Sequence, residues 1–175
     1  MYDNVLRSLL GCSANSSKFR AYLLSQHTIA SLPAPESYPD AVYFSLPDQG
    51  VSYVFEPISP YKPKYKDSLA TLALDQLTLT AIDIYAKSAS KTQTAFFKSS
   101  LLPLTFSCEN FDAGVIKKGI VLDVNTTGKE LVDALSEPER KGGGAGSIPI
   151  WLEWTRVGIK IEMGNSLLSR FYFNM

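Results

Sequence analysis

The sequence predicts an α+β protein in which short helices pack on antiparallel sheet and one helix–hairpin module occurs twice. Two stretches carry this prediction. Residues 126–163 contain a capped helix, a proline stop, a glycine-rich segment and two alternating strands. Residues 42–55 contain a second pair of alternating strands, preceded by two short helical patterns. The match between the stretches is one of pattern, with little identity, and it predicts a tandem duplication.

The helix of the first stretch has clear ends. Thr127 and Glu130 stand in the capping-box relation, in which each side chain accepts from the other's backbone amide. Pro138 removes an amide and disfavours helical geometry before it, so the helix should stop near Ser136. Its apolar stripe consists of Leu131, Val132 and Leu135.

The segment after the helix is rich in glycine and opens with two basic residues. Arg140 and Lys141 precede Gly142, Gly143, Gly144 and Gly146. Successive glycine amides beside positive charge can form an anion-binding nest. Alternatively, the glycines only permit tight turns in a flexible connector. A phosphate-binding P-loop is excluded, because no Lys-Ser/Thr pair follows the glycines and they lead into a strand.

The second hairpin pairs strands 148–154 and 159–163 across a turn at 155–157. Trp151 and Glu153 lie on its outward face. The tryptophan could anchor an interface or stack on a ligand, or it could be covered by another element. Glu153 and Glu162 could form cross-strand pairs with Lys160 and Arg156.

The N-terminal copy contains strands 42–46 and 51–55, and Gly50 aligns with Gly158. Upstream, Asp3 can cap a helix over 5–10 that stops at Gly11, and Ser16 or Ser17 can cap a helix over 19–26. Further along the chain we expect an exposed connection at 57–66, a third strand at 77–85, a linker at 87–94 and a strand within 115–124. The form of residues 167–173 stays open. These segments predict two modules, 1–86 and 95–175, or one fused domain.

The composition of the chain limits the classes of function that are expected. Lys plus Arg and Asp plus Glu are equal at 17 each, so no basic footprint for nucleic acid is expected. No apolar run approaches a membrane span, and the first residues lack a signal-peptide core. Cys12 and Cys108 fit buried thiols in a reducing compartment, so we expect a soluble protein of the cytosol or nucleus.

Groups that carry chemistry are scarce. His27 is the one histidine of the chain, and we expect it at the surface or in a loop, although Cys12 could approach it. No cysteines or carboxylates stand at metal-ligand spacing, so neither a metal nor another cofactor is expected. The sequence names no catalytic residue.

The order of helix, Glu137–Pro138 stop, glycine-rich loop and antiparallel strands resembles the helix-plus-sheet modules of two bacterial groups. These are the β-lactamase inhibitor protein, itself a tandem duplication, and the outer-membrane assembly lipoprotein. Ser136 stands where those modules have glycine. Residues 137–144 with 151–154 are also similar to uncharacterised fungal proteins. The first resemblance implies protein binding through a sheet face.

Together these features predict a non-catalytic interaction module that binds another protein through a sheet face or the loop 140–146. The alternative is a small-ligand or anion-binding protein, or an enzyme, that uses a cleft between the halves. The candidate binding residues are Arg140, Lys141, Gly142, Gly143, Gly144, Trp151 and Glu153.

Overall fold

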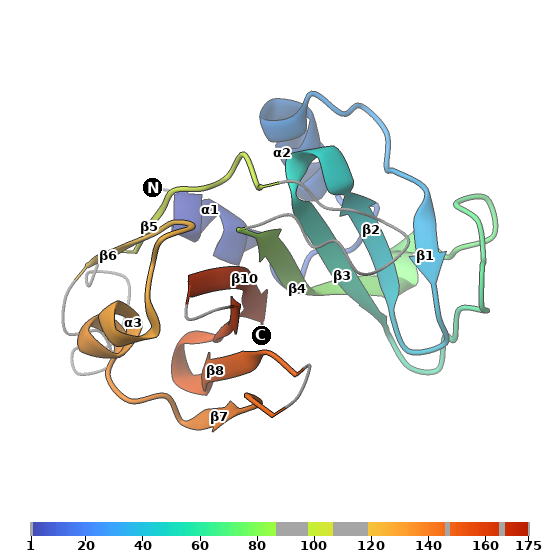
Figure 1. The fold of residues 1–175 in the computed structure, drawn as a ribbon. Coiled ribbons are helices and arrows are strands. Elements are labelled where there is room, and N and C mark those ends of the chain that lie inside the picture. The colour runs from blue at the N-terminus through green and yellow to red at the C-terminus, as the bar shows by residue number, and fades with distance from the viewer. Residues whose placement is uncertain (1, 87–97, 107–118, 146–147, 165–166, 175) are drawn as a thin grey trace.

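The computed structural model describes residues 2–86, 98–106, 119–145, 148–164 and 167–174. It has one large antiparallel sheet and a few short helices, which confirms the α+β class (Figure 1). The sheet has eight strands and runs without interruption through both halves of the chain. In spatial order these are β1 (Pro35–Ser37), β2 (Val42–Leu46), β3 (Val51–Pro57), β4 (Leu77–Tyr85), β10 (Leu167–Asn174), β9 (Ile159–Gly164), β8 (Ile150–Trp154) and β7 (Arg140–Gly142).

The helices and a small hairpin pack on one face of this sheet, the inner face. They are α1 (Tyr2–Leu9), α2 (Ser17–His27), α3 (Gly128–Leu135) and the pair β5 (Leu104–Phe106) and β6 (Ile120–Leu122). Phe19 of α2 contacts the ring of Tyr53, and Phe106 of β5 contacts the ring of Phe171. The buried side chains form one core, because the apolar positions of each strand alternate onto this face.

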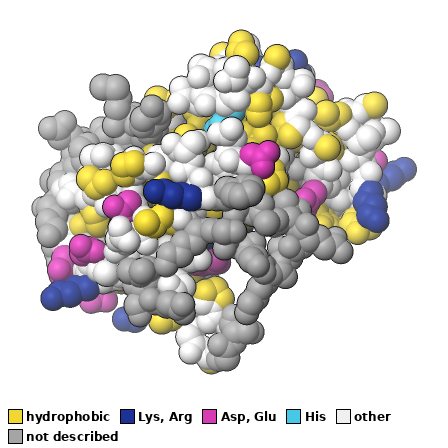
Figure 2. All heavy atoms as spheres, turned by 45° about the horizontal axis from the view of Figure 1, so that its top comes forward, with side chains coloured by type: hydrophobic (Ala, Val, Ile, Leu, Met, Phe, Trp, Pro, Cys, Tyr) yellow, Lys and Arg dark blue, Asp and Glu magenta, His cyan; other side chains and the backbone are white. Residues whose placement is uncertain are grey.

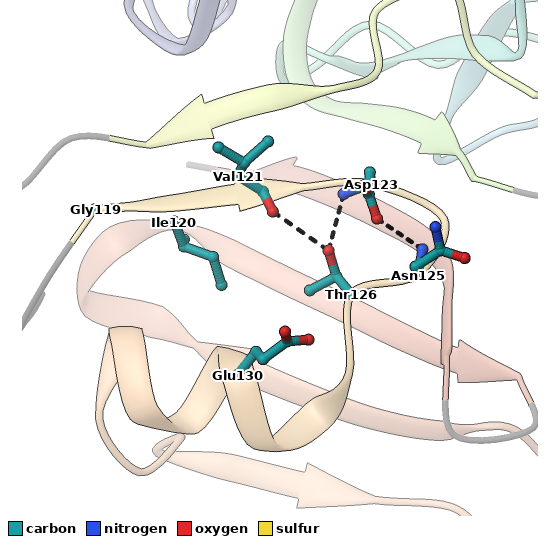
Figure 3. A pocket seen from close by; sticks show the side chains of 7 residues that line it. All are labelled: Gly119, Ile120, Val121, Asp123, Asn125, Thr126 and Glu130. Carbon is teal, nitrogen blue, oxygen red and sulfur yellow. Dashed lines mark hydrogen bonds between the residues drawn. The ribbon is translucent and has the colours of Figure 1, made fainter.

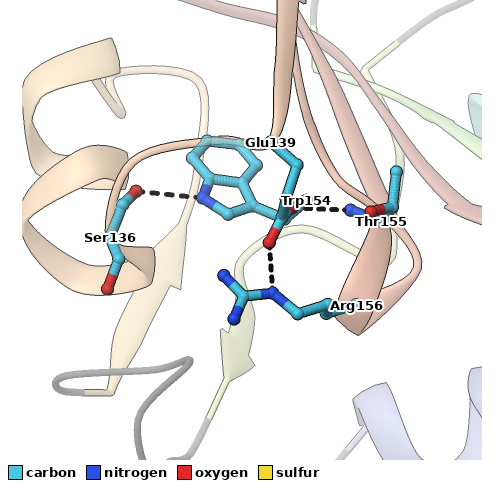
Figure 4. Close-up of polar contacts among 5 residues, drawn as sticks. All are labelled: Ser136, Glu139, Trp154, Thr155 and Arg156. Atoms are coloured by element: carbon cyan, nitrogen blue, oxygen red, sulfur yellow. Dashed lines mark hydrogen bonds and ion pairs between the residues drawn. The ribbon is translucent and has the colours of Figure 1, made fainter.

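Helix α3 has the predicted ends. The capping box of Thr127 and Glu130 is present in both directions, and the helix ends at Leu135. Its C-terminal turn is tied to the last hairpin, since the buried indole of Trp154 donates to the Ser136 carbonyl at 3.0 Å (Figure 4). Glu139 accepts from the Thr155 amide and from Arg156, which holds the chain between α3 and β7 against the β8–β9 turn.

The two halves share part of their element order and some local irregularities. In each, a helix precedes four strands, and the second and third strands are joined by a 3₁₀ turn, Pro47–Gln49 or Thr155–Val157. Gly50 and Gly158 follow these turns, both at φ +62°. A bulge interrupts the pairing of β3 with β4 and of β9 with β10, each time three residues after the first strand begins. The halves meet where β4 pairs with β10, with Asp83 opposite Tyr172.

Several expectations from the sequence need correction. Helix α1 begins at Tyr2, so Asp3 lies within it and not at its cap. Arg140 to Gly142, expected in a loop, form edge strand β7, because their backbone pairs with β8. His27, expected at the surface, is only 6% exposed.

Other expected segments are now assigned. Ser16 caps α2. Leu77–Tyr85 is a strand beside β3, as expected, but it is the fourth strand of its half because β1 precedes the predicted hairpin. The open segment near the C-terminus is β10. The strand expected within 115–124 is confirmed for 120–122. The expected linker at 87–94 and the second cysteine, Cys108, lie outside the described residues.

Candidate functional site: an aromatic–cation row on the outer face of the sheet

The outer face of the sheet carries the side chains that alternate with the core. Near the β4–β10 junction five of them form a continuous stack across four strands, in which aromatic rings and cations alternate. We call this the aromatic–cation row: Trp151, Lys160, Tyr172, Arg170 and Tyr85. The successive cation-to-ring distances along it are 5.2, 5.5, 4.5 and 4.7 Å. Such contacts stabilise partly desolvated cations over the negative faces of the rings.

Strand register places these residues together although they come from distant parts of the sequence. Tyr85 lies opposite Arg170, and Arg170 opposite Glu162, across β4, β10 and β9. Glu162 in turn lies opposite Trp151 on β8. Because opposite residues in an antiparallel sheet lie on one face, the whole row follows from the pairing.

Arg170 is the centre of the row. Its guanidinium forms an ion pair with Asp83 and lies between the rings of Tyr85 and Tyr172. The Arg170 side chain is 28% exposed. Burial raises the pKa of Asp83, and the neighbouring Arg170 opposes that shift. The pKa of Arg170 is raised by its carboxylate partner, so the guanidinium stays charged.

The tyrosines of the row are held in their neutral form. Tyr172 donates to the Glu162 carboxylate at 2.6 Å. Burial and Glu162 raise the pKa of Tyr172, and burial raises the pKa of Tyr85 to about 12. A hydroxyl with a raised pKa is protonated at neutral pH, so Tyr85 and Tyr172 are neutral members of the row.

The residues expected from the sequence continue the row toward the edge of the sheet. Arg140 on β7 forms an ion pair with Glu153 on β8 at 3.1 Å, and Lys141 pairs with Glu137 at 3.6 Å. More than half of the side-chain surface of Arg140 and of Lys141 is exposed, whereas only 12% of the Glu153 side chain is exposed. The structure thus brings Arg140, Glu153 and Trp151 onto one face; Lys141 alternates to the other.

Close contacts and backbone geometry explain why glycine occupies these positions at the edge of the sheet. The Trp151 indole lies against Gly142, where an added Cβ would come within 2.8 Å of the ring. Gly143 has φ +79°, and a Cβ there would meet the Pro149 carbonyl oxygen at 1.9 Å. Gly144 donates its amide to the Ile148 carbonyl at 3.0 Å. An anion nest, one of the two interpretations of these glycines, would need that amide free, so these contacts favour the other interpretation, tight turning of the chain. Gly146 lies outside the described residues.

Sequence reasoning missed the centre of the row. Asp83 and Arg170 each interrupt an apolar strand, and this interruption was the available signal. The sequence predicts a strand at 77–85 but leaves the form of 167–173 open, and it places the two segments in different modules, so it does not pair them.

His27 lies away from this site, on the inner side of the sheet. Its Nε2 lies 2.7 Å from the Tyr53 hydroxyl, and burial lowers its pKa. Only a small part of its ring (cyan) reaches the surface in Figure 2. Within the described residues no group of three His, Cys, Asp or Glu side chains could hold a metal ion.

A polar pocket of about 320 Å³ lies between β6 and α3 (Figure 3). Its polar groups serve local turns. The Thr126 hydroxyl accepts from the Asp123 amide at 2.8 Å, and Asp123 accepts from the Asn125 amide. Glu130 belongs to the α3 capping box. The pocket is therefore built by turn and cap chemistry.

On the face shown in Figure 2, basic side chains (dark blue) are scattered, with acidic ones (magenta) near them. None of the helices in the described ranges has the length and apolar character needed to cross a membrane. Comparisons with protein-family models, curated proteins and solved structures found no match.

Proposed function

We propose that this protein is a non-catalytic module that binds another protein through the outer face of its sheet. The observation that carries this proposal is the aromatic–cation row, continued by Arg140 to the sheet edge. Trp, Tyr and Arg are the residues that most often dominate the energetics of protein interfaces.

Two properties of the row favour a macromolecular partner. Its side chains are already ordered by stacking and ion pairs, so binding would cost little side-chain entropy. Its cations Arg170, Lys160 and Arg140 stand beside the carboxylates Asp83, Glu162 and Glu153. This balance gives weak attraction for a free anion and good complementarity to a mixed polar surface.

The test is purification of tagged protein from its own cells, with identification of what accompanies it by mass spectrometry. The test variants are Trp151→Ala and the double replacement Arg140→Glu/Lys141→Glu. The matched control is Lys62→Glu/Lys64→Glu, which reverses two equally exposed charges on a connection of the other half. We expect a stoichiometric partner that both test variants lose, with a drop in affinity of about 30-fold for Trp151→Ala.

Recovery of the protein alone, or of a partner that every variant retains, would contradict the proposal. In that case thermal-shift measurements with inorganic phosphate and sulfate address the alternative, a small-ligand or anion-binding protein that uses a cleft between the halves. Arg170, at the junction of the two halves, is the cation tested. Stabilisation that Arg170→Gln abolishes would support that alternative.

We further propose that the two halves arose by tandem duplication. The repeated 3₁₀ turns, the two glycines at φ +62° and the equivalent bulges support this. Related sequences provide the test: their halves should align about Gly50 and Gly158, and halves with no similarity there would argue against it. We also propose that the protein acts in the cytosol or nucleus. Imaging of the tagged protein tests this location.

A further inference from the structure

A pocket of about 360 Å³ lies on the outer face of the N-terminal half, at the hairpin that joins β1 to β2. The strand register places Glu36 directly opposite Tyr43. Tyr43 alternates with buried positions of β2, so this pair lies on the face away from the core. We call the site the tyrosine–carboxylate pocket, and its lining side chains are Glu36, Tyr38, Asp40 and Tyr43.

A tight turn at Pro39 and Asp40 brings these side chains together. The Tyr38 amide donates to the Ala41 carbonyl at 2.8 Å and closes the turn. Proline presets its own φ and aspartate tolerates turn geometry, so both residues suit this position. Tyr38 follows Glu36 by two residues, which places both on one face of the hairpin. The pocket is therefore built by one local unit, residues 36–43.

Tyrosine rings form two walls of the pocket. The ring centroids of Tyr38 and Tyr43 lie 6.0 Å apart, and the ring planes stand at 87° to each other. The faces of such rings carry negative potential and attract cations. Two rings at a right angle therefore offer a corner in which one cation can contact both.

A third ring, that of Tyr65, extends this cluster. It lies 5.6 Å from the ring of Tyr38. Ser37 of β1 holds the neighbours of Tyr65 in place, because its hydroxyl donates to the Lys64 carbonyl and its carbonyl accepts from the Lys66 amide. The Lys66 ammonium lies 5.1 Å from the centroid of the Tyr65 ring. The cluster thus already holds one ammonium against a ring face.

Among the described residues, the charged side chains that line the pocket are both carboxylates. Glu36 and Asp40 are exposed, and within the described ranges neither forms a hydrogen bond or an ion pair. Burial raises the pKa of Tyr43, and the negative charges of Asp83 and Asp40 raise it further, against the opposing effect of Arg170. The pocket thus combines two uncompensated carboxylates with the negative faces of two rings.

This combination selects an organic cation over a metal ion. A calcium ion takes about six to eight oxygen ligands, and two carboxylates supply too few. A primary ammonium is strongly hydrated, whereas a fully alkylated one has no N–H group to desolvate and presents its charge on methyl groups. Methyl groups pack directly on ring faces, so an alkylated ammonium fits this pocket best.

We propose that the tyrosine–carboxylate pocket binds a fully alkylated ammonium group. The group belongs either to a free small molecule or to a trimethylated lysine side chain, because both present the same trimethylammonium. The site goes beyond the proposed function, since its lining residues lie outside the aromatic–cation row.

The first probe is choline chloride, titrated into the full-length protein and followed by saturation-transfer NMR of the choline methyl protons. The neutral control is 3,3-dimethylbutan-1-ol, which has the same shape with carbon in place of the charged nitrogen. We expect choline to bind with a dissociation constant of about 1–10 mM and the neutral compound to bind at least about tenfold more weakly.

The test variants are Tyr38→Leu and the double replacement Glu36→Gln/Asp40→Asn. Each should weaken choline binding about fivefold, because the first removes a ring face and the second removes the negative charges. Tyr38→Phe keeps the ring and should bind like the unmodified protein. The matched control is Asp48→Asn/Glu56→Gln, which removes two exposed carboxylates of the same half outside the pocket. Thermal melts establish that all variants fold.

A peptide with one trimethyllysine, compared with the same peptide carrying lysine, distinguishes the two sources of the ammonium. Binding tighter than that of choline and lost with plain lysine identifies a modified protein side chain. Binding of the peptide no tighter than that of choline identifies a free alkylammonium. Both results support the proposal.

Three results would overturn it. The first is the absence of saturable choline binding up to about 100 mM. The second is equal binding of the neutral compound, which would make the site a simple apolar pocket. The third is an equal loss of binding in the matched control, which would reflect the overall charge of the surface. None of these results bears on the aromatic–cation row, because its test uses other residues.

Discussion

The two tryptophans of the chain lie three residues apart on β8 and should respond to replacement in opposite ways. Trp154 points into the core with no exposed surface, and its indole donates to the Ser136 carbonyl at 3.0 Å. Trp151 points to the outer face and is partly exposed. We predict that Trp154→Phe lowers the free energy of unfolding and that Trp151→Phe leaves it nearly unchanged.

The magnitude follows from what each replacement removes. In Trp154→Phe the Ser136 carbonyl loses this buried donor, which costs about 1–3 kcal/mol. The smaller ring leaves a void worth about 1 kcal/mol more. The total, about 2–4 kcal/mol, is a large part of the stability of a typical domain. Trp151→Phe keeps a ring over Lys160 and Gly142, so its cost should stay below about 1 kcal/mol.

Urea denaturation followed by circular dichroism measures both effects. With a slope of about 2 kcal/mol per molar urea, Trp154→Phe should move the midpoint down by about 1–2 M. The order of the two positions should be reversed for partner binding. Trp151→Ala should weaken binding more than Trp154→Phe does, because Trp151 is the residue that we place in the interface. Equal losses of stability at the two positions would refute the assignment of one tryptophan to the core and the other to the surface.

Three further predictions concern buried polar groups and the glycine edge. Burial lowers the pKa of His27 below its ordinary value of 6.5, so the neutral imidazole stabilises the fold. In thermal melts this contribution should be fully present above pH 6.5 and should be lost as the pH falls through the lowered pKa. The variant His27→Gln should show a flatter dependence of stability on pH. Gly143→Ala should cost more than about 2 kcal/mol, from its positive φ and its contact with a carbonyl oxygen, whereas Gly128→Ala at the start of α3, with open space around it, should be neutral or stabilising in the same urea titration. Asp83→Asn should cost about 2–3 kcal/mol by leaving the Arg170 charge half-buried without its ion partner, and a double-mutant cycle with Arg170→Met should recover part of the loss.

Local signals in the sequence predicted the local structure well. The capping box at Thr127, the cap at Ser16 and the alternating hairpins are each encoded within a few residues, and all are present. Strands β1 and β7 were not predicted. Each has three residues without apolar alternation and exists because a neighbouring strand offers backbone partners.

The candidate site was only partly predictable for the same reason. Trp151, Glu153 and Arg140 belong to one hairpin and its edge, so a local pattern could place them on one face. Asp83 and Arg170 meet through the pairing of β4 with β10, which joins segments 87 residues apart. No short-range pattern specifies that pairing, because the register depends on both halves being folded.

The outer faces of the two halves differ in charge. Glu153 on β8 and Lys160 and Glu162 on β9 stand at the same distance from the 3₁₀ turn as Ser45 on β2 and Ser52 and Val54 on β3. Both cations of the aromatic–cation row, Lys160 and Arg170, also belong to the C-terminal half.

In the N-terminal half these outer-face positions hold uncharged side chains. The proposed interface is centred on the aromatic–cation row, so strands β2 and β3 of the N-terminal half lie outside it. An outer-face substitution there, such as Tyr43→Ala, should therefore leave partner binding intact, whereas Trp151→Ala should weaken it about 30-fold.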